Sequence, residues 1–177
     1  DSSRDAKRFQ YERFILSQLL VMALKGVPAF YLPALLASEN DIKSFSMTGQ
    51  RRDLNREKFK SENLSAVLNN PESNANKNLK YLRNAMDVRS KLKQFHPCSQ
   101  MKCLSKGRSD IVVIKRGIGP GSVFAIHNMT ENKINYQLND NDLPKIIDND
   151  FNTHDFLTST KYNCKNISLD PFQVIWL

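Results

Sequence analysis

The sequence has few of the features that mark a disulfide-rich, membrane or secreted protein. Its three cysteines, Cys98, Cys103 and Cys164, are an odd and sparse set, which excludes a disulfide scaffold and favours a reducing compartment, the cytoplasm. The longest uncharged apolar stretch, Phe14 to Leu24, is too short to span a bilayer, so we expect a buried helix and no membrane partner. The chain opens with Asp1 and without a signal-peptide pattern, an opening that we interpret as cut rather than natural.

Acidic residues are the minority among the charged ones. The chain has 18 Asp and Glu against 26 Lys and Arg, a net charge of +8 that favours anionic partners, nucleic acid first. The basic residues are spread from Arg4 to Lys165, however, and the aromatic residues occupy apolar-periodic positions instead of alternating with basic ones as stacking platforms would. With 40% hydrophobic and 25% charged residues the composition is that of an ordinary globular protein, so we expect no nucleic-acid partner.

Hydrophobic periodicity predicts an α/β first half. Apolar residues recur at three- and four-residue steps from Asp5 to Lys25, which predicts an amphipathic helix that Gly26 would end as its C′ residue. The nearly continuous apolar run Val27 to Leu32 predicts a strand buried on both faces. The polar stretch Pro33 to Ser61 has no clear period and predicts a long loop, which in a compact protein is usually functional.

A second amphipathic helix is predicted around Leu79 to Leu92, after an Asn-rich capping stretch, and it should end near Phe95. Beyond it the pattern predicts an antiparallel all-β half, with strands at Ile111 to Ile114, Ser122 to Ile126, Ile134 to Leu138, Asn166 to Leu169 and Phe172 to Trp176. The Gly117 to Gly121 segment then connects a hairpin, because a phosphate cradle would need a helix after it.

Several residues could in principle carry chemistry, and the sequence argues against each. Thr153-His154-Asp155 lies between short β segments, so we interpret it as a surface turn. His96, Cys98 and Cys103 lack a fourth zinc ligand and the usual paired spacing, so no metal is expected. No Ser or Cys occupies a nucleophile-elbow pattern. We therefore expect no catalytic residue within this chain.

The densest polar cluster, Gln50 to Glu57, has two interpretations. It can be the solvated beginning of a helix, as charge clusters usually are. Alternatively it contacts a ligand, because an arginine fork in a loop beyond the C-terminal end of a barrel strand can pair with a carboxylate and donate to sugar hydroxyls.

Motifs along the chain resemble the sucrose phosphorylase group of glycoside hydrolase family 13, and together they cover essentially all of it. Phe14 to Tyr31 resembles the seventh helix and eighth strand of the (β/α)8 barrel of that group. Leu35 to Asp41 and Thr48 to Arg56 look like the loop after that strand. Four further segments are similar to the eighth helix and the closing β domain of that group: Val88-Arg89, Phe95-His96-Pro97, Phe124 to Asn128 and Leu169 to Leu177.

The resemblance implies one binding residue in this chain. Arg52, the first arginine of Arg52-Asp53-Leu54-Asn55-Arg56, matches the arginine that lines the glucosyl-binding subsite and pairs with an aspartate of an earlier barrel loop. The group uses an aspartate nucleophile, a glutamate acid/base and a stabilising aspartate, with retention of configuration. All three should precede residue 1, so the chain alone is expected to be inactive.

These observations together predict a fold and a domain organisation. The expected fold class is α/β followed by all-β. Residues 1–97 would form the end of a (β/α)8 TIM barrel, its last helix, strand and helix, and residues 98–177 an antiparallel, β-sandwich-like C-terminal domain.

The expected function is that of the complete enzyme: a retaining phosphorylase that takes glucose from an α-glucoside and passes it to phosphate, without cofactor or metal. Its partners would be the sugar, phosphate and the upstream barrel portion. The acceptor stays open, because Arg52 to Arg56 is closest to sucrose phosphorylases, whereas Phe95-His96-Pro97 and the β domain look more like relatives acting on glucosylglycerate, glucosylglycerol or sucrose 6-phosphate. Rival functions are a noncatalytic β module that binds carbohydrate or a protein, and a basic nucleic-acid binder.

Overall fold

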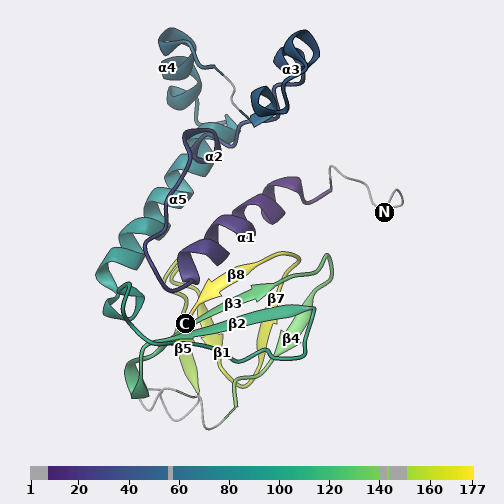
Figure 1. Cartoon of the computed structure of the whole chain (residues 1–177). Helices are drawn as coiled ribbons and strands as arrows, with labels where there is room; N and C mark the ends of the chain where they lie inside the picture. Colours follow the sequence, from purple (N-terminus) through teal and green to yellow (C-terminus); the bar gives the residue numbers. More distant parts are fainter. Residues whose placement is uncertain (1–7, 56–57, 140–142, 144–150) are drawn as a thin grey trace. The chain divides into compact units, whose positions relative to one another are not determined.

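The computed structural model describes residues 8–55, 58–139, 143 and 151–177, and the chain divides into two compact units. One unit contains residues 1–28 together with 86–177, and the other contains residues 29–85. Figure 1 shows the helices first and the antiparallel strands after residue 100. Among the described residues no helix is long and apolar enough to cross a membrane.

The first unit is built on an antiparallel sheet of four strands in the order β1-β2-β3-β8. The main hairpin pairs Ile111 with Asn128 and Arg116 with Val123, and the Gly117 to Gly121 segment connects its strands as predicted. Two smaller antiparallel ladders, β4-β7 and β5-β6, complete the β part. The strands are β1 (Met101–Cys103), β2 (Ile111–Arg116), β3 (Val123–Asn128), β4 (Ile134–Tyr136), β5 (Asn152–His154), β6 (Lys161–Asn163), β7 (Ile167–Leu169) and β8 (Val174–Trp176).

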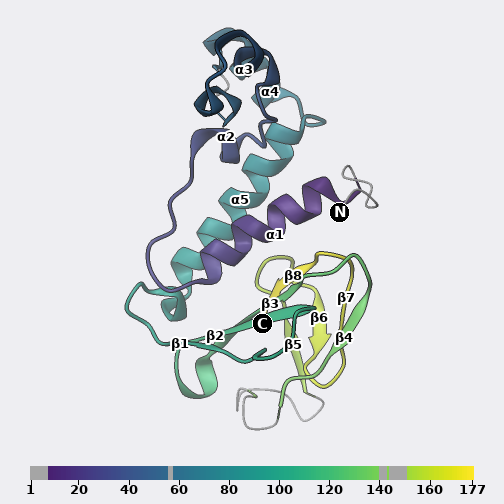
Figure 2. The ribbon, with the colours of Figure 1, turned by 45° about the vertical axis from the view of Figure 1, so that its right-hand side comes forward.

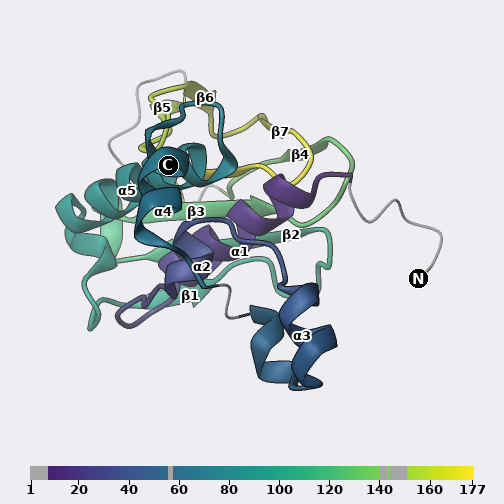
Figure 3. The same ribbon diagram turned by 90° about the horizontal axis from the view of Figure 1, so that it is seen from above.

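Strands β3 and β8 are buried on both faces, which is unusual in an antiparallel sheet, whereas the edge strand β1 is exposed. Every residue of β3 is buried. One face packs against the β4-β7 ladder through a core that includes Phe124, Ile126 and Ile167. Helix α1 (Gln10–Ala23) contacts β3 and lies across the sheet in Figures 1 and 3, and its Leu19 and Met22 are fully buried. The predicted amphipathic helix is thus confirmed from residue 10; residues 8 and 9 form a turn instead, and residues 5–7 lie outside the described residues.

Helix α1 ends differently from the prediction. Gly26 was expected as the C′ residue, but the chain already turns to an extended conformation at Leu24, and Gly26 adopts a positive φ of 119° two residues later. The last carbonyls of the helix, which have no partner within it, instead accept hydrogen bonds from two arginines that are distant in sequence. The Arg116 guanidinium donates to the Ala23 and Leu24 oxygens at 3.0 and 2.6 Å, and Arg89 donates to the Met22 oxygen at 2.9 Å. Cations at a helix C-terminus are favourable because the carbonyl end carries partial negative charge.

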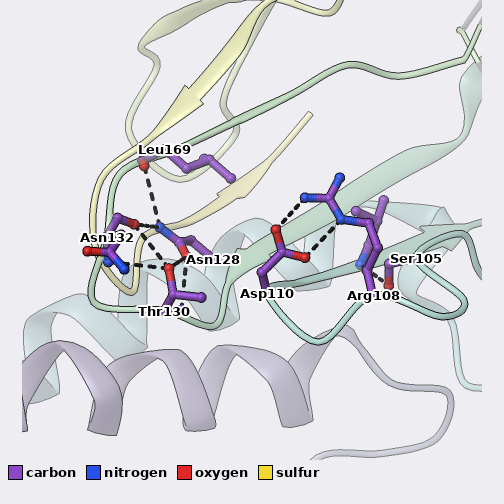
Figure 4. A network of polar contacts seen from close by, with 8 residues as sticks. Ser105, Arg108, Asp110, Asn128, Thr130, Asn132 and Leu169 are labelled. Carbon is purple, nitrogen blue, oxygen red and sulfur yellow. Dashed lines mark hydrogen bonds and ion pairs between the residues drawn. The ribbon is translucent and has the colours of Figure 1, made fainter.

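A buried asparagine fixes the turns at one end of the sheet. The Asn128 amide nitrogen donates to the backbone oxygens of Asn132 and Asp170 at 2.7 and 2.8 Å, while its oxygen accepts from the Thr130 N–H at 2.9 Å. Figure 4 shows this network beside the exposed Arg108–Asp110 ion pair. All polar atoms of the Asn128 side chain are therefore used within the fold, and the residue has a structural role.

The predicted strand at Val27 to Leu32 is absent. Residues 27–31 are extended without strand pairing, and a short helix, α2 (Leu32–Leu35), begins at the end of the run. Val27 is 79% exposed, so burial on both faces is also wrong for this chain. An extended segment becomes a strand only when a neighbour completes its backbone hydrogen bonds, and no described strand pairs with this one.

The long loop predicted for Pro33 to Ser61 is a series of short helical elements. After α2 come α3 (Ile42–Thr48), the 3-10 turn η1 (Arg51–Asn55) and α4 (Ser61–Asn69). Each has nine residues or fewer, so none shows enough turns to produce a helical period in the sequence.

The second amphipathic helix is confirmed as α5 (Asn74–Lys91), followed by the 3-10 turn η2 (Lys93–Phe95). The Asn-rich stretch contains its cap, because the Ser73 hydroxyl accepts the N–H of Asn76 at 3.1 Å. Figure 2 shows α2 and α4 beside the first turns of α5, all within the second unit.

Candidate functional site

The candidate site is the segment from Asp41 to Asn55, which carries Arg52. It begins with α3, whose N-cap is Asp41: the carboxylate accepts the Ser44 N–H at 2.9 Å and the Ser44 hydroxyl at 2.5 Å. These hydrogen bonds, the side-chain one first, hold the pKa of Asp41 below its usual value, so the cap stays ionised. The helix ends at Gly49, which takes the left-handed conformation with φ 67° and donates its N–H to the Phe45 oxygen at 2.8 Å.

Two hydrogen bonds fold η1 back onto α3. The Asp41 N–H donates to the Leu54 oxygen at 2.7 Å, which joins the start of α3 to the end of η1. The Thr48 hydroxyl lies 2.6 Å from the Asp53 carboxylate, to which it donates, and accepts the Gln50 N–H at 3.2 Å. The Asn-Asp and Arg-Asp-Leu-Asn motifs, which are separate in the sequence, are thus one hydrogen-bonded substructure.

Arg52 is exposed on this braced turn. Within the described residues its guanidinium has no hydrogen-bond or ion-pair partner, and the adjacent Asp53 is engaged by Thr48 instead. Its five N–H donors are therefore available to a carboxylate or to sugar hydroxyls, and the planar fork can make two parallel hydrogen bonds to one carboxylate. Arg51 is exposed in the same way and serves as an internal comparison.

The sequence indicated Arg52 but not the residues that support it. Asp41 and Thr48 brace the turn, and only Asp41 had a readable signal, an acidic residue directly before a short helix with Ser44 three positions later. The Thr48–Asp53 contact depends on the reversal at Gly49 and has no sequence pattern of its own.

The prediction that Thr153-His154-Asp155 is a surface turn is wrong. Thr153 and His154 lie in strand β5, with His154 exposed, and Asp155 after it is 1% exposed. Its carboxylate accepts the Trp176 N–H at 2.8 Å and the Thr158 hydroxyl at 2.6 Å, so it ties the turn after β5 to β8. A buried carboxylate is tolerated when its oxygens are hydrogen-bonded in this way.

The cysteines and histidines do not assemble into a site in the described part of the chain. Cys98 and Cys103 are exposed free thiols, and Cys164 is buried within the β core. The His96 ring accepts the N–H of Cys98 at 3.2 Å. No group of three or more His, Cys, Asp or Glu side chains among these residues could hold a metal ion.

Curated proteins that are similar to this chain in sequence are glucosylglycerate phosphorylases. The chain is 31% identical over 130 residues to a glucosylglycerate phosphorylase of Allomeiothermus silvanus, covering 73% of this chain and 23% of the relative. A glucosylglycerate phosphorylase of Escherichia coli K12 is 24% identical over 166 residues, covering 93% of this chain and 28% of the relative. The chain therefore spans about a quarter of the length of these relatives. No family model matches it.

Solved structures resemble the fold over nearly the whole chain. The trehalose-6-phosphate hydrolase of Bacillus licheniformis superimposes with a TM-score of 0.66 at 15% identity, covering 97% of this chain and 39% of that one. The isomaltulose synthase of Klebsiella sp. LX3 gives a TM-score of 0.68 at 15% identity, covering 93% and 37%. At such identities the likeness establishes the fold.

Proposed function

The chain belongs to the sucrose phosphorylase group of glycoside hydrolase family 13, and we propose that it is the C-terminal portion of a retaining phosphorylase that transfers glucose from an α-glucoside to phosphate. The similarity to relatives supports glucosylglycerate as this α-glucoside, because both glucosylglycerate phosphorylases described above align with most of this chain. Sucrose, suggested by the Arg52 to Arg56 motif, is the alternative substrate.

The observation that carries the proposal is the guanidinium of Arg52, which is exposed on a hydrogen-bonded turn and has no partner among the described residues. In the complete enzyme Arg52 binds the glucosyl unit and pairs with an aspartate from the upstream barrel. The turn limits the number of conformations available to its backbone, so less entropy is lost when the fork binds. The nucleophile, the acid/base and the stabilising carboxylate are supplied upstream, and the isolated chain is inactive.

The domain organisation follows from the same proposal. Residues 1–97 complete the barrel and residues 98–177 form the closing β domain. The segment at Val27 to Leu32 pairs with upstream strands in the complete enzyme, which accounts for its exposed apolar side chains, Val27 at 79% and Tyr31 at 54%. The upstream barrel is thus the main protein partner. The free thiols of Cys98 and Cys103 fit a reducing compartment, the cytoplasm.

The test is the substitution Arg52→Lys in the complete enzyme. Lysine keeps the charge but loses the planar fork, and the partner carboxylate is left imperfectly paired. We expect kcat/KM for glucosylglycerate and phosphate to fall by roughly 30-fold to several thousand-fold, which corresponds to about 2–5 kcal/mol of transition-state stabilisation.

Arg51→Lys is the matched control, because Arg51 is exposed on the same turn. It should leave kcat/KM within about threefold of the parent, well under 1 kcal/mol. If both substitutions have effects that small, Arg52 does not bind the glucosyl unit and the cluster is only a solvated turn.

A further inference from the structure

The hydroxyl oxygen of Thr48 lies at the centre of the turn that carries Arg52. Three hydrogen bonds close this turn. The Asp53 N–H donates to the Gln50 oxygen at 3.0 Å, the Gln50 N–H donates to Thr48 Oγ1 at 3.2 Å, and this Oγ1 atom lies 2.6 Å from the Asp53 carboxylate. Two of the three bonds therefore share one oxygen atom, and together they hold residues 50 and 53 on either side of Arg52.

The Thr48 hydroxyl proton has two acceptors within reach, and only one of them can receive it. The Asp53 carboxylate oxygen lies at 2.6 Å, and the Ser44 backbone oxygen, one helical turn earlier, lies at 3.0 Å. A hydroxyl has one proton and two lone pairs, and a hydrogen bond to an ionised acceptor is roughly twice as strong as one between neutral groups. Thr48 therefore donates to Asp53, and a lone pair remains to accept the Gln50 N–H.

The backbone of Thr48 is itself held in place, so its side chain can hold the turn. Thr48 is the last residue of α3, and Gly49 after it reverses the chain in the left-handed conformation. The Asp41 N–H donates to the Leu54 oxygen at 2.7 Å, which joins α3 to η1 independently of Thr48. Loss of the Thr48 hydroxyl should thus loosen residues 50–53 without unfolding α3 or detaching η1.

We propose that Thr48 is a positioning residue that acts on the reaction through Arg52, an inference that rests on the proposed function. Arg52 is exposed and its side chain has no partner among the described residues, so the backbone of the turn sets the direction of its guanidinium. The planar fork makes two parallel hydrogen bonds to a carboxylate only from a narrow range of directions. A turn that Thr48 holds in one conformation keeps the fork within this range, so its ordering costs less when the sugar binds.

Amide hydrogen exchange of the 177-residue chain, followed by NMR, tests the hydrogen bonds themselves. Thr48→Val keeps the shape of the side chain but removes the oxygen, so the Gln50 N–H should exchange at least about fivefold faster. The Phe45 N–H, which donates to the Asp41 oxygen within α3, should exchange at the parent rate. Thr48→Ser keeps the oxygen and should restore the parent rate at Gln50. Equal exchange of Gln50 in the parent and in Thr48→Val would overturn the proposal.

Kinetics of the complete enzyme connect these bonds to the reaction. Thr48→Val should lower kcat/KM for glucosylglycerate and phosphate by about tenfold, whereas Thr48→Ser should stay within about threefold of the parent. Ser46→Ala is the matched control and should also stay within about threefold. The Ser46 hydroxyl donates to the Ile42 oxygen four residues earlier at 2.9 Å, and no described contact joins it to the turn. A Thr48→Val enzyme as active as Ser46→Ala would contradict the proposal.

A double-mutant cycle with Arg52→Lys shows whether Thr48 acts through Arg52. Once the fork is lost its direction no longer matters, so Thr48→Val in the Arg52→Lys enzyme should lower kcat/KM by less than about threefold. The same loss in both backgrounds would mean that Thr48 only stabilises the fold, and would refute its positioning role. If Arg52→Lys alone has no effect, the proposed function fails, and exchange of the Gln50 N–H still decides whether Thr48 holds the turn.

Discussion

At the scale of single residues, His127 is the side chain whose protonation is most strongly perturbed. It lies on β3 opposite Val112 and is fully buried, with its Nδ1 atom 3.3 Å from the Val112 backbone oxygen. Burial lowers the pKa of His127 from 6.5 to about 4, because the charged imidazolium would lose its hydration. The ring is therefore neutral at physiological pH, and it serves the core rather than acid–base chemistry.

This burial predicts a pH dependence of stability. The folded pKa of about 4 lies below the unfolded value of 6.5, so the unfolded chain binds the proton first and stability is lost as pH falls from 6.5 toward 4. The complete loss attributable to His127 is about 3 kcal/mol by the relation of 1.4 kcal/mol per pKa unit. Urea unfolding of the 177-residue chain at pH 7 and pH 5 should show part of this loss.

The variant His127→Gln isolates the contribution. It removes the titrating group, so the decrease in unfolding free energy between pH 7 and pH 5 should be smaller in the variant by about 1–2 kcal/mol. An identical decrease in parent and variant would mean that carboxylates alone cause the acid sensitivity.

At the scale of elements, the β2–β3 connection is held by a glycine and a glutamine. Gly117 has a φ of +87°, and a Cβ atom there would approach the Gln94 Cγ to 2.9 Å. The Gln94 amide also donates to the Gly121 oxygen across the same connection. The position is therefore constrained both by its left-handed backbone and by lack of space.

Gly117→Ala tests that constraint, and Gly107→Ala is its matched control. Gly107 has a similar φ of +83° but open space where the Cβ would lie. Both substitutions introduce backbone strain of about 1 kcal/mol. Gly117→Ala should lower the unfolding free energy by about 1–3 kcal/mol more, because Gln94 must also shift. Equal destabilisation of the two variants in urea titrations would show that packing against Gln94 is unimportant.

At the scale of the whole molecule, the proposed function assigns the chain a substrate-binding turn at Arg52 and places the catalytic carboxylates elsewhere in the complete enzyme. We expect no phosphorolysis or hydrolysis of glucosylglycerate or sucrose by the purified 177-residue chain, because the proposed function assigns the reacting carboxylates to the upstream part of the complete enzyme. The measurement is release of glucose 1-phosphate and of glucose against a blank without protein. Turnover that follows the chain through purification would show that the chain contains catalytic groups of its own.

The sequence by itself determined the two long helices and the main strands of the β part, while the role of Arg52 stays a prediction. The repeating apolar residues of α1 and α5 and the short runs of β2 and β3 are local patterns, and local geometry converts them directly into helices and strands. Arg52 was indicated by its motif alone. The short helices between Pro33 and Ser61 were missed because caps such as Asp41 stabilise them, and elements of nine residues or fewer show too little periodicity.

Tertiary structure decided what depends on distant partners. At the C-terminal end of α1, Arg116 donates hydrogen bonds to backbone oxygens 92 and 93 positions away in sequence. No local sequence pattern could therefore predict that Arg116, and not Gly26, completes this helix end. Burial of Asp155 is tolerated because its carboxylate accepts the N–H of Trp176, which is 21 positions away in sequence. The apolar run at Val27 did not become a strand because no described strand pairs with it. Hydrophobicity can be read from a sequence, but completed hydrogen bonds require the partner that supplies them.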